Sequence, residues 1–241
     1  MLTTRVFEYS TGRFLFAKAQ PFRRDIADET PDVPALPETL LSIELQLQER
    51  SADLSIVSQA VLADLGATIQ ILRLAGSEYG NSGSRPVRIE DCIADLGLEA
   101  CLRAAGRGTF VRGALHRAVF DLWEHSHRVA LHSRLLAEDA GGFVHPYEAY
   151  LAGLLHALGA LPTLLGWSPD DIAADRAVAA LDLADRWSFP VLLRDYFCEV
   201  RKPGSNPQVS KIVEQAHCLV ESSSRCPMLT PASHASVPTI R

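Results

Sequence analysis

The sequence predicts an all-α fold, and three observations support that prediction. Apolar residues recur at three- and four-residue spacing in most segments between residue 37 and residue 220. Prolines and glycines stand at many of the boundaries between these segments, where they suit helix starts and helix ends. After residue 30, no segment shows the sustained alternation of apolar and polar residues that is typical of a half-buried strand.

The first 30 residues are predicted to form an arm outside the helical body. Arg5–Tyr9 and Arg13–Ala17 are rich in β-branched and aromatic residues, and Ser10–Gly12 lies between them. This pattern is typical of a short hairpin or an extended arm. We place the start of the helical domain at residue 31.

Five helices are expected in the first half of the domain, residues 31–112. Pro37 suits the first turn of a helix, where its missing N–H is not needed. Ser51 or Asp53 can cap the second helix by accepting hydrogen bonds from free N–H groups. Gly97 suits the end of the fourth. The expected helices cover 37–49, 54–62, 66–78 and 89–96, and a fifth begins at Leu98.

The second half, residues 113–202, is expected to begin with a long helix over 115–139, followed by three more. Pro146 opens the next helix and Gly159 suits its end. Ser168 is a good N-cap for a helix that runs to about Trp187, and Pro190 opens another that runs to about Val200. A C-terminal helix with an apolar stripe is expected within 203–221, and a flexible tail over 222–241.

One segment is apolar enough to be tested against a membrane. Ala149–Trp167 contains 19 residues without Lys, Arg, Asp or Glu, which is close to the length of a bilayer span. Gly159 and Pro162 interrupt it, however, and acidic residues flank it instead of a basic cluster. We therefore interpret it as a buried core helix.

Composition narrows the class of function. A net charge of −6 argues against a general nucleic-acid binder and against a binder of anionic membranes. The five cysteines are odd in number and show no C-x-x-C spacing, which indicates reduced thiols and neither a disulfide framework nor a zinc knuckle. No N-terminal basic region is followed by an apolar segment, so we expect no signal peptide. We expect a cytoplasmic protein with no nucleic-acid partner and no membrane partner.

A basic, glycine-interrupted segment at 103–117 joins the two halves. Arg103, Arg107 and Arg112 could grip an anion such as a cyclic dinucleotide, since arginine binds phosphate in a bidentate fork and glycine lets the backbone approach closely. The alternative is a solvated connector, because charge runs are usually exposed. Both interpretations stay open at this point.

Many short segments match one family pattern in order: Leu36-Pro37, Leu72–Gly80, Pro86–Glu90, Asp95–Gly97, Leu122-Trp123, His125-Ser126, Arg128–Ala130, Ala152–His156, Trp187 and Pro190. Together they make the sequence from about Leu36 to Val200 resemble an HDOD domain, the HD-related output domain of bacterial signalling proteins. The resemblance implies two packed helical halves, the second similar to the helical core of the HD superfamily. It also implies a regulatory or interaction module more often than an enzyme. One departure is Gly76, where the family usually has asparagine.

The same resemblance locates a degenerate metal motif. His125 and His156 match the two histidines of the HD pattern, but Ala157 stands where that pattern has its aspartate. The nearest candidates for the family's distant aspartate are Asp182 and Asp185. Two imidazoles fall short of the three or four protein ligands typical of tight metal sites. We therefore expect a vestigial pocket with no metal and no cofactor, in which His156 is a structural residue held by a hydrogen bond within the core.

These expectations favour a non-catalytic signal-transduction module that acts through contacts with a signalling protein. Two alternatives remain. One is a sensor of an anionic small ligand, and the other is a residual metal-dependent phosphohydrolase.

Overall fold

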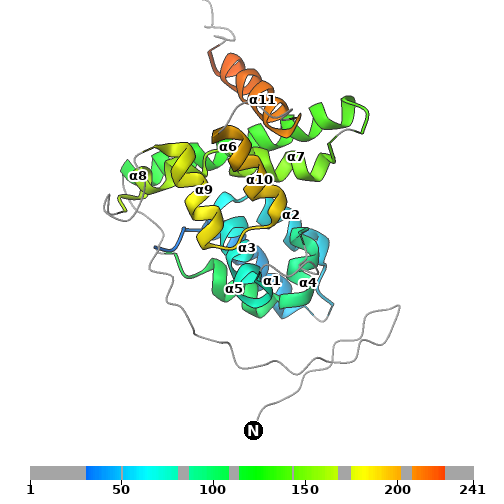
Figure 1. The fold of residues 1–241 in the computed structure, drawn as a ribbon. Coiled ribbons are helices and arrows are strands. Elements are labelled where there is room, and N and C mark those ends of the chain that lie inside the picture. Colours follow the sequence, from blue (N-terminus) through cyan, green and yellow to red (C-terminus); the bar gives the residue numbers. More distant parts are fainter. Residues whose placement is uncertain are drawn as a thin grey trace, which may run out of the picture. The chain divides into compact units, whose positions relative to one another are not determined.

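The computed structural model describes residues 31–49, 51–80, 87–108, 114–142, 144–167, 175–201 and 208–225. These residues form helices joined by turns, with no strand among them, so the all-α prediction is confirmed (Figure 1). The hairpin or arm predicted for residues 1–30 lies outside the described residues, as does the tail from residue 226.

The helices follow the chain in an order close to the expected one. Those of the first half are α1 (Pro37–Gln48), α2 (Leu54–Leu62), α3 (Leu65–Tyr79), α4 (Ile89–Leu96) and α5 (Leu98–Ala105). Those of the second half are α6 (Ala114–Asp139), α7 (Pro146–Leu155), a 3-10 turn η1 (Leu158–Ala160), α8 (Leu161–Leu165), α9 (Arg176–Arg186) and α10 (Val191–Arg201). The C-terminal helix α11 spans Gln208–Arg225.

Helix α7 ends earlier than the sequence predicted. It stops at Leu155 instead of continuing to Gly159, and the chain turns through η1 into α8. The His156 ring hydrogen-bonds the carbonyl of Gly153, which in a continuing helix serves the N–H of Ala157. Gly159 has a different role, because a Cβ on it would lie 1.9 Å from the carbonyl oxygen of Arg176. The glycine lets the start of α9 pack directly against η1.

Two further boundaries differ from expectation. The predicted start at Ser168 lies outside the described residues, and α9 begins at Arg176 with Asp175 as its N-cap. Helix α11 continues to Arg225, four residues beyond the predicted end at 221. The Ser222 hydroxyl donates to the carbonyl of Cys218 at 2.7 Å, so this serine is accommodated inside the helix.

One helical segment among the described residues, Pro146–Leu165, is long and apolar enough to cross a membrane by length and composition. Together, α2 and α3 would also pass that test, but they are bent by 112° at their junction. Most of the Pro146–Leu165 segment is buried against the rest of the protein, and Leu151, Leu154 and Leu155 are fully buried. The segment therefore packs as core helix, as the sequence predicted.

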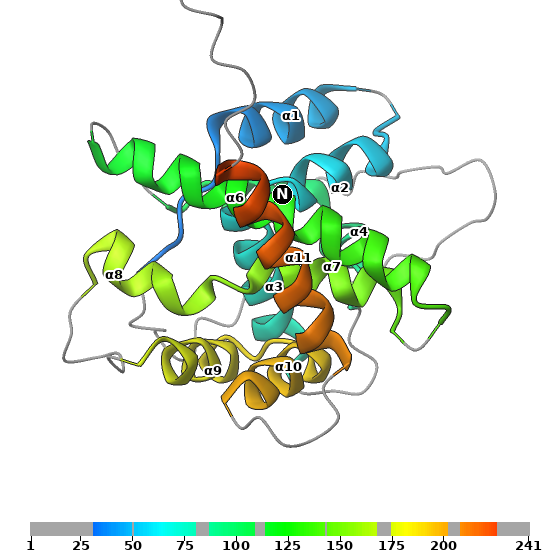
Figure 2. The same ribbon diagram turned by 90° about the horizontal axis from the view of Figure 1, so that it is seen from above.

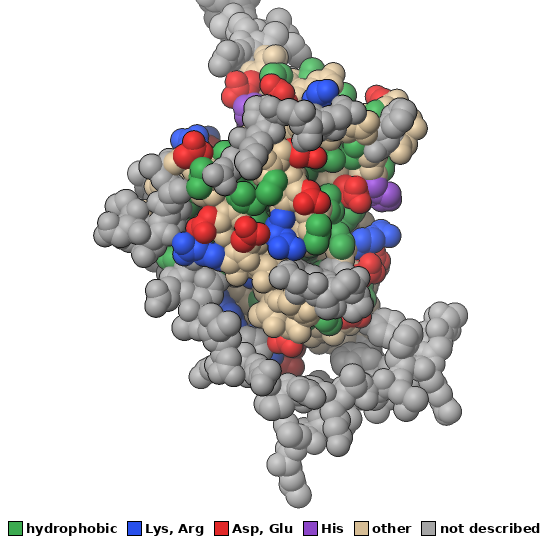
Figure 3. Space-filling view, in the orientation of Figure 1, with side chains coloured by type: hydrophobic (Ala, Val, Ile, Leu, Met, Phe, Trp, Pro, Cys, Tyr) green, Lys and Arg blue, Asp and Glu red, His purple; other side chains and the backbone are tan. Residues whose placement is uncertain are grey.

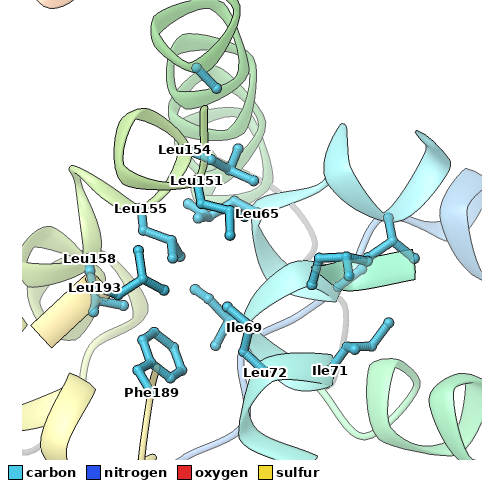
Figure 4. Packing of buried hydrophobic residues seen from close by; sticks show 14 of the residues in the cluster. Leu65, Ile69, Ile71, Leu72, Leu151, Leu154, Leu155, Leu158, Phe189 and Leu193 are labelled. Carbon is cyan, nitrogen blue, oxygen red and sulfur yellow. The ribbon is translucent and has the colours of Figure 1, made fainter. Parts of the chain in front are cut away.

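The hydrophobic core is continuous across both halves of the domain. Helix α3 lies at its centre and is buried on almost every side from Leu65 to Gly76. In Figure 4, Ile69 and Leu72 of α3 face Leu155 and Phe189 from the second half. Gly76 makes this approach feasible, because a Cβ there would lie 2.4 Å from the Trp187 carbonyl oxygen. The glycine found where the family usually has asparagine thus has a packing explanation.

A single buried carboxylate, Asp64, joins three parts of the domain. It caps α3 by accepting from the N–H of Gly66 at 2.9 Å and of Ala67 at 3.2 Å. It accepts from the N–H of Leu36 at 2.7 Å, which fixes the segment before α1. It also accepts from Nε1 of Trp123 on α6 at 2.9 Å. Burial raises the pKa of the Asp64 carboxyl, and these hydrogen bonds oppose that rise.

Two tyrosines of α7 add further links between the halves. The Tyr147 hydroxyl accepts from the N–H of Ile89, the first residue of α4, at 2.6 Å. The Tyr150 hydroxyl donates to the carbonyl of Leu62, the last residue of α2, at 2.8 Å. Both tyrosines bond backbone groups at helix ends that have no partner within their own helix.

Replacement of Asp64 by alanine should destabilise the domain by at least about 3 kcal/mol. Several donors lose their acceptor, and each buried donor left without a hydrogen bond costs about 1–3 kcal/mol of folding stability. Asp53→Ala is the matched control, since Asp53 caps α2 but is exposed, and its carboxylate accepts from the N–H of Ser55. It should cost about 1 kcal/mol. Urea unfolding measures both, and equal losses would contradict the role given to Asp64.

Candidate functional site

Three histidine side chains meet where α6, α7 and α11 converge. His125 comes from α6, His156 directly follows α7, and His217 comes from α11. One ring nitrogen from each lies within 4.8 Å of the other two. The ring centroids are 5.3 Å apart for His125 and His156, 5.0 Å for His125 and His217, and 5.2 Å for His156 and His217. We call this group the three-histidine cluster.

Close packing of α6 against α7 brings the first two rings together. Gly153 faces α6 so tightly that a Cβ on it would lie 2.6 Å from Ser133 Oγ and 2.9 Å from the Cα of Ala130. Real Cβ atoms do not approach other atoms so closely, so this helix pair requires glycine at that position. The carbonyl of the same glycine accepts the hydrogen bond from His156.

Helix α11 brings the third ring. It packs on both α6 and α7, and Figure 2 shows it lying across them. Val213, Ala216 and Val220 form its buried stripe. His217 directly follows Ala216 and is therefore at the border of that stripe, where its ring is partly buried.

The hydrogen bond of His156 fixes its tautomer. Its Nδ1 lies 2.7 Å from the carbonyl oxygen of Gly153. A carbonyl can only accept, so the proton of a neutral ring is assigned to Nδ1 and the lone pair to Nε2. The hydrogen bond expected from the sequence is therefore present.

The surroundings of His125 and His156 favour the neutral form of both rings. The pKa of His156 is lowered to about 4, mainly by burial and to a smaller extent by the neighbouring rings of His125 and His217, while the hydrogen bond to Gly153 opposes the change. Burial also lowers the pKa of His125, as do His217 and Arg128, and Glu221 opposes the change. His156 therefore carries no charge at neutral pH.

Carboxylates stand at the edge of the cluster or away from it. Glu221 Oε1 lies 3.8 Å from Nε2 of His217, and both side chains are substantially exposed. Asp182 pairs with Arg186 at 2.9 Å, and Asp185 lies 3.7 Å from Arg194. Within the part of the chain that the structure describes, the cluster is the one group of three or more His, Cys, Asp or Glu side chains close enough to share a metal ion.

The structure thus pairs the two histidines that the sequence singled out and adds one that it missed. His125 and His156 do face one another, and Ala157 follows them without contributing a ligand atom. His127, two residues along α6, instead packs edge-on against the ring of Tyr150 at 6.4 Å between centroids. In the sequence, His217 is one polar residue beside the apolar stripe of the C-terminal helix, and no spacing rule connects it to His125 or His156.

The described arginines of the segment at 103–117 that were proposed as an anion site are exposed. Arg103 is exposed and pairs with Glu99 at 3.2 Å. Arg107 is exposed as well, whereas Arg112 lies outside the described residues. Gly108 packs against the segment before α1, because a Cβ on it would lie 2.6 Å from the Cα of Pro34. The glycine therefore serves chain packing, and anion binding by these arginines stays a prediction.

Comparison with known proteins settles the family. The model of the HDOD domain matches residues 33–174, which is more than half of the chain. The chain belongs to the HDOD family. A sequence relative, an uncharacterized protein of Treponema pallidum (strain Nichols), is 26% identical over 137 residues, which cover 56% of this chain but only 26% of that protein.

Two solved structures share the fold of this chain. The MmoQ response regulator of Methylococcus capsulatus str. Bath superimposes with a TM-score of 0.63 at 19% identity, over 83% of this chain and 90% of that one. A virulence factor (cj0248) of Campylobacter jejuni subsp. jejuni gives a TM-score of 0.50 at 17% identity, over 78% and 76% of the two chains. At these identities the likeness concerns the fold alone.

Gly153→Ala should destabilise the domain by about 1–3 kcal/mol, because the added methyl group overpacks the contact between α6 and α7. Gly106→Ala is a control, since its Cβ would meet only the carbonyl of Leu102 at 3.1 Å. It should be close to neutral. Chemical unfolding of both variants makes the comparison, and a Gly153→Ala protein as stable as the parent would disprove the close approach.

Proposed function

We propose that this HDOD protein is a non-catalytic regulatory module of bacterial signalling that acts through protein contacts in the cytoplasm. The observation that carries the proposal is the chemistry of the three-histidine cluster, which combines three imidazoles with alanine at position 157. The fold shared with MmoQ, which is named a response regulator, supports a place in signalling.

The donor set does not fit the hydrolytic centre of the HD superfamily. Hydrolysis of a phosphodiester needs a metal ion that polarises phosphate and lowers the pKa of a bound water. In the HD pattern, an aspartate next to the second histidine and a distant aspartate help to hold that metal. Here the first position is Ala157, and the two candidates for the second, Asp182 and Asp185, pair with arginines outside the cluster. No hydrolytic step can be assigned to these residues.

The surface offers apolar contact sites for a protein partner. Leu41 and Leu45 lie one turn apart on α1 and are 55% and 51% exposed, and α2, which packs on α1, exposes Ile56. We call Leu41 and Leu45 the α1 patch. Leu131 and Leu135 form a similar pair on α6, the α6 patch. On the face seen in Figure 3, acidic and basic side chains of the described residues lie interspersed, which agrees with a protein partner better than with nucleic acid.

The purified chain should hydrolyse no phosphodiester when Mn²⁺ or Fe²⁺ is supplied. Bis(p-nitrophenyl) phosphate and a cyclic dinucleotide are suitable substrates. His125→Ala sets the background, because it removes a residue that any HD-type centre requires. Metal-dependent turnover that disappears in His125→Ala would overturn the non-catalytic assignment.

A partner captured from a lysate of the source bacterium should depend on the α1 patch. Leu41→Glu/Leu45→Glu should abolish capture, because it places two charges on the apolar contact. The fold should tolerate the change, because both positions are exposed and substitutions there alter stability little. Leu131→Glu/Leu135→Glu makes the same change on the α6 patch and shows whether the loss of capture is specific to α1. Capture that survives the α1 change, or is lost equally in both variants, would count against this surface.

A further inference from the structure

The geometry points to a binding site for one late first-row divalent cation, of the Zn²⁺ class, formed by His125, His156 and His217. In this site the metal fastens the C-terminal helix α11 to α6 and to the end of α7. The inference goes beyond the proposed function and does not depend on it, because a cation held in this way has a structural role whether or not the domain is catalytic.

The distances suit a shared ion. Three nitrogens that all lie within 4.8 Å of one another share a centre no more than about 2.8 Å from each of them (4.8 Å divided by the square root of three), while Zn–N bonds are about 2.0–2.1 Å long. Each nitrogen has less than about 0.8 Å to move, which small side-chain rotations supply. His217 stands on a separate helix and is partly exposed, so its ring has room for that adjustment.

The type of ligand selects the class of metal. Imidazole suits Zn²⁺, Ni²⁺, Cu²⁺ and Fe²⁺, whereas Mg²⁺, Ca²⁺ and Mn²⁺ prefer oxygen ligands. Three histidines leave one position of a tetrahedral ion for water. The loss of a carboxylate at Ala157 therefore changes which metal the pocket prefers and does not abolish binding.

One ligand already has the supporting contact that metal-bound histidines usually have. Metal-ligating histidines almost always donate the N–H of the other ring nitrogen to a carbonyl or carboxylate, which fixes the ring and directs the lone pair. His156 makes this contact through Nδ1 to Gly153 at 2.7 Å. Gly153 is also the residue that allows α6 and α7 to pack closely, so the same backbone position orients one ligand and brings the second near it.

The source of the third ligand distinguishes this site from the HD metal centre. The HDOD match ends at residue 174, and His217 lies on a helix beyond it. Two imidazoles alone would be too few for a tight metal site, and His217 raises the number of available nitrogen ligands to three. Because the ligands come from three elements, the ion cross-links α11 to the body of the domain.

Metal binding by the full, tag-free chain is the direct test, since a polyhistidine tag would itself bind the ion. After treatment with a chelator and its removal, the chain is titrated with Zn²⁺ and with Co²⁺. We expect one ion per chain and the strong visible absorption of tetrahedral Co²⁺. His217→Ala should weaken binding by more than about 100-fold, because loss of even an outer-shell partner costs about 10–100-fold. His132→Ala, a histidine elsewhere on α6, should bind as the parent does.

Hydrogen exchange with and without Zn²⁺ tests the cross-link itself. Zn²⁺ should slow exchange in α11 and around His156 in the parent, with no such change in His217→Ala and none in α1–α5 of either protein. His217→Ala is the decisive variant because its side chain is partly exposed, and circular dichroism confirms that it is folded. One ion per chain with unchanged affinity in His217→Ala, or equal weakening in His132→Ala, would overturn the site.

Discussion

The arrangement of the two halves depends on one buried carboxylate. Asp64 caps α3, holds the segment before α1 through Leu36, and accepts from Trp123 of α6, so one residue of the first half sets the place of the longest helix of the second. A buried carboxylate is costly unless its lone pairs are used, and here several donors converge on it. The same hydrogen bond helps to place the three-histidine cluster, because Trp123 lies two residues before His125 on α6.

Much of the fold could be predicted because local signals and long-range packing agree. The bounds of α2 and α4 follow from a capping aspartate and a terminal glycine, which act within a few residues. The end of α7 could not be predicted in that way. It depends on the His156 ring binding the carbonyl of Gly153 and on Arg176 packing against Gly159, and only the folded chain brings that second pair together. The glycine that looked like a helix terminator is a packing contact.

The same distinction between local signals and long-range packing applies to the three histidines of the candidate site. His125 and His156 could be found because a known pattern spaces them along the chain. His217 could not, because its place depends on which face of α11 lies against α6 and α7. The apolar stripe predicted that α11 docks, but a stripe does not specify its partner helices or the direction of docking. In the arginine segment, Arg103 pairs with Glu99 and Gly108 packs against Pro34, and anion binding there stays a prediction.

In the HD pattern, one pocket both binds a metal ion and supplies negative charge from carboxylates. In this chain the pocket offers histidines in place of one of those carboxylates. Carboxylates beside the histidines bind hard cations and supply negative charge, both of which suit the activation of water near phosphate. Alanine at 157 removes such a group, and the site proposed above takes a nitrogen ligand from His217, on a helix outside the matched family region. A set of imidazoles still holds a borderline-soft cation firmly, but it adds no negative charge and couples the ion to a helix position. A cation at the proposed site would therefore attach α11 to α6 and to the end of α7.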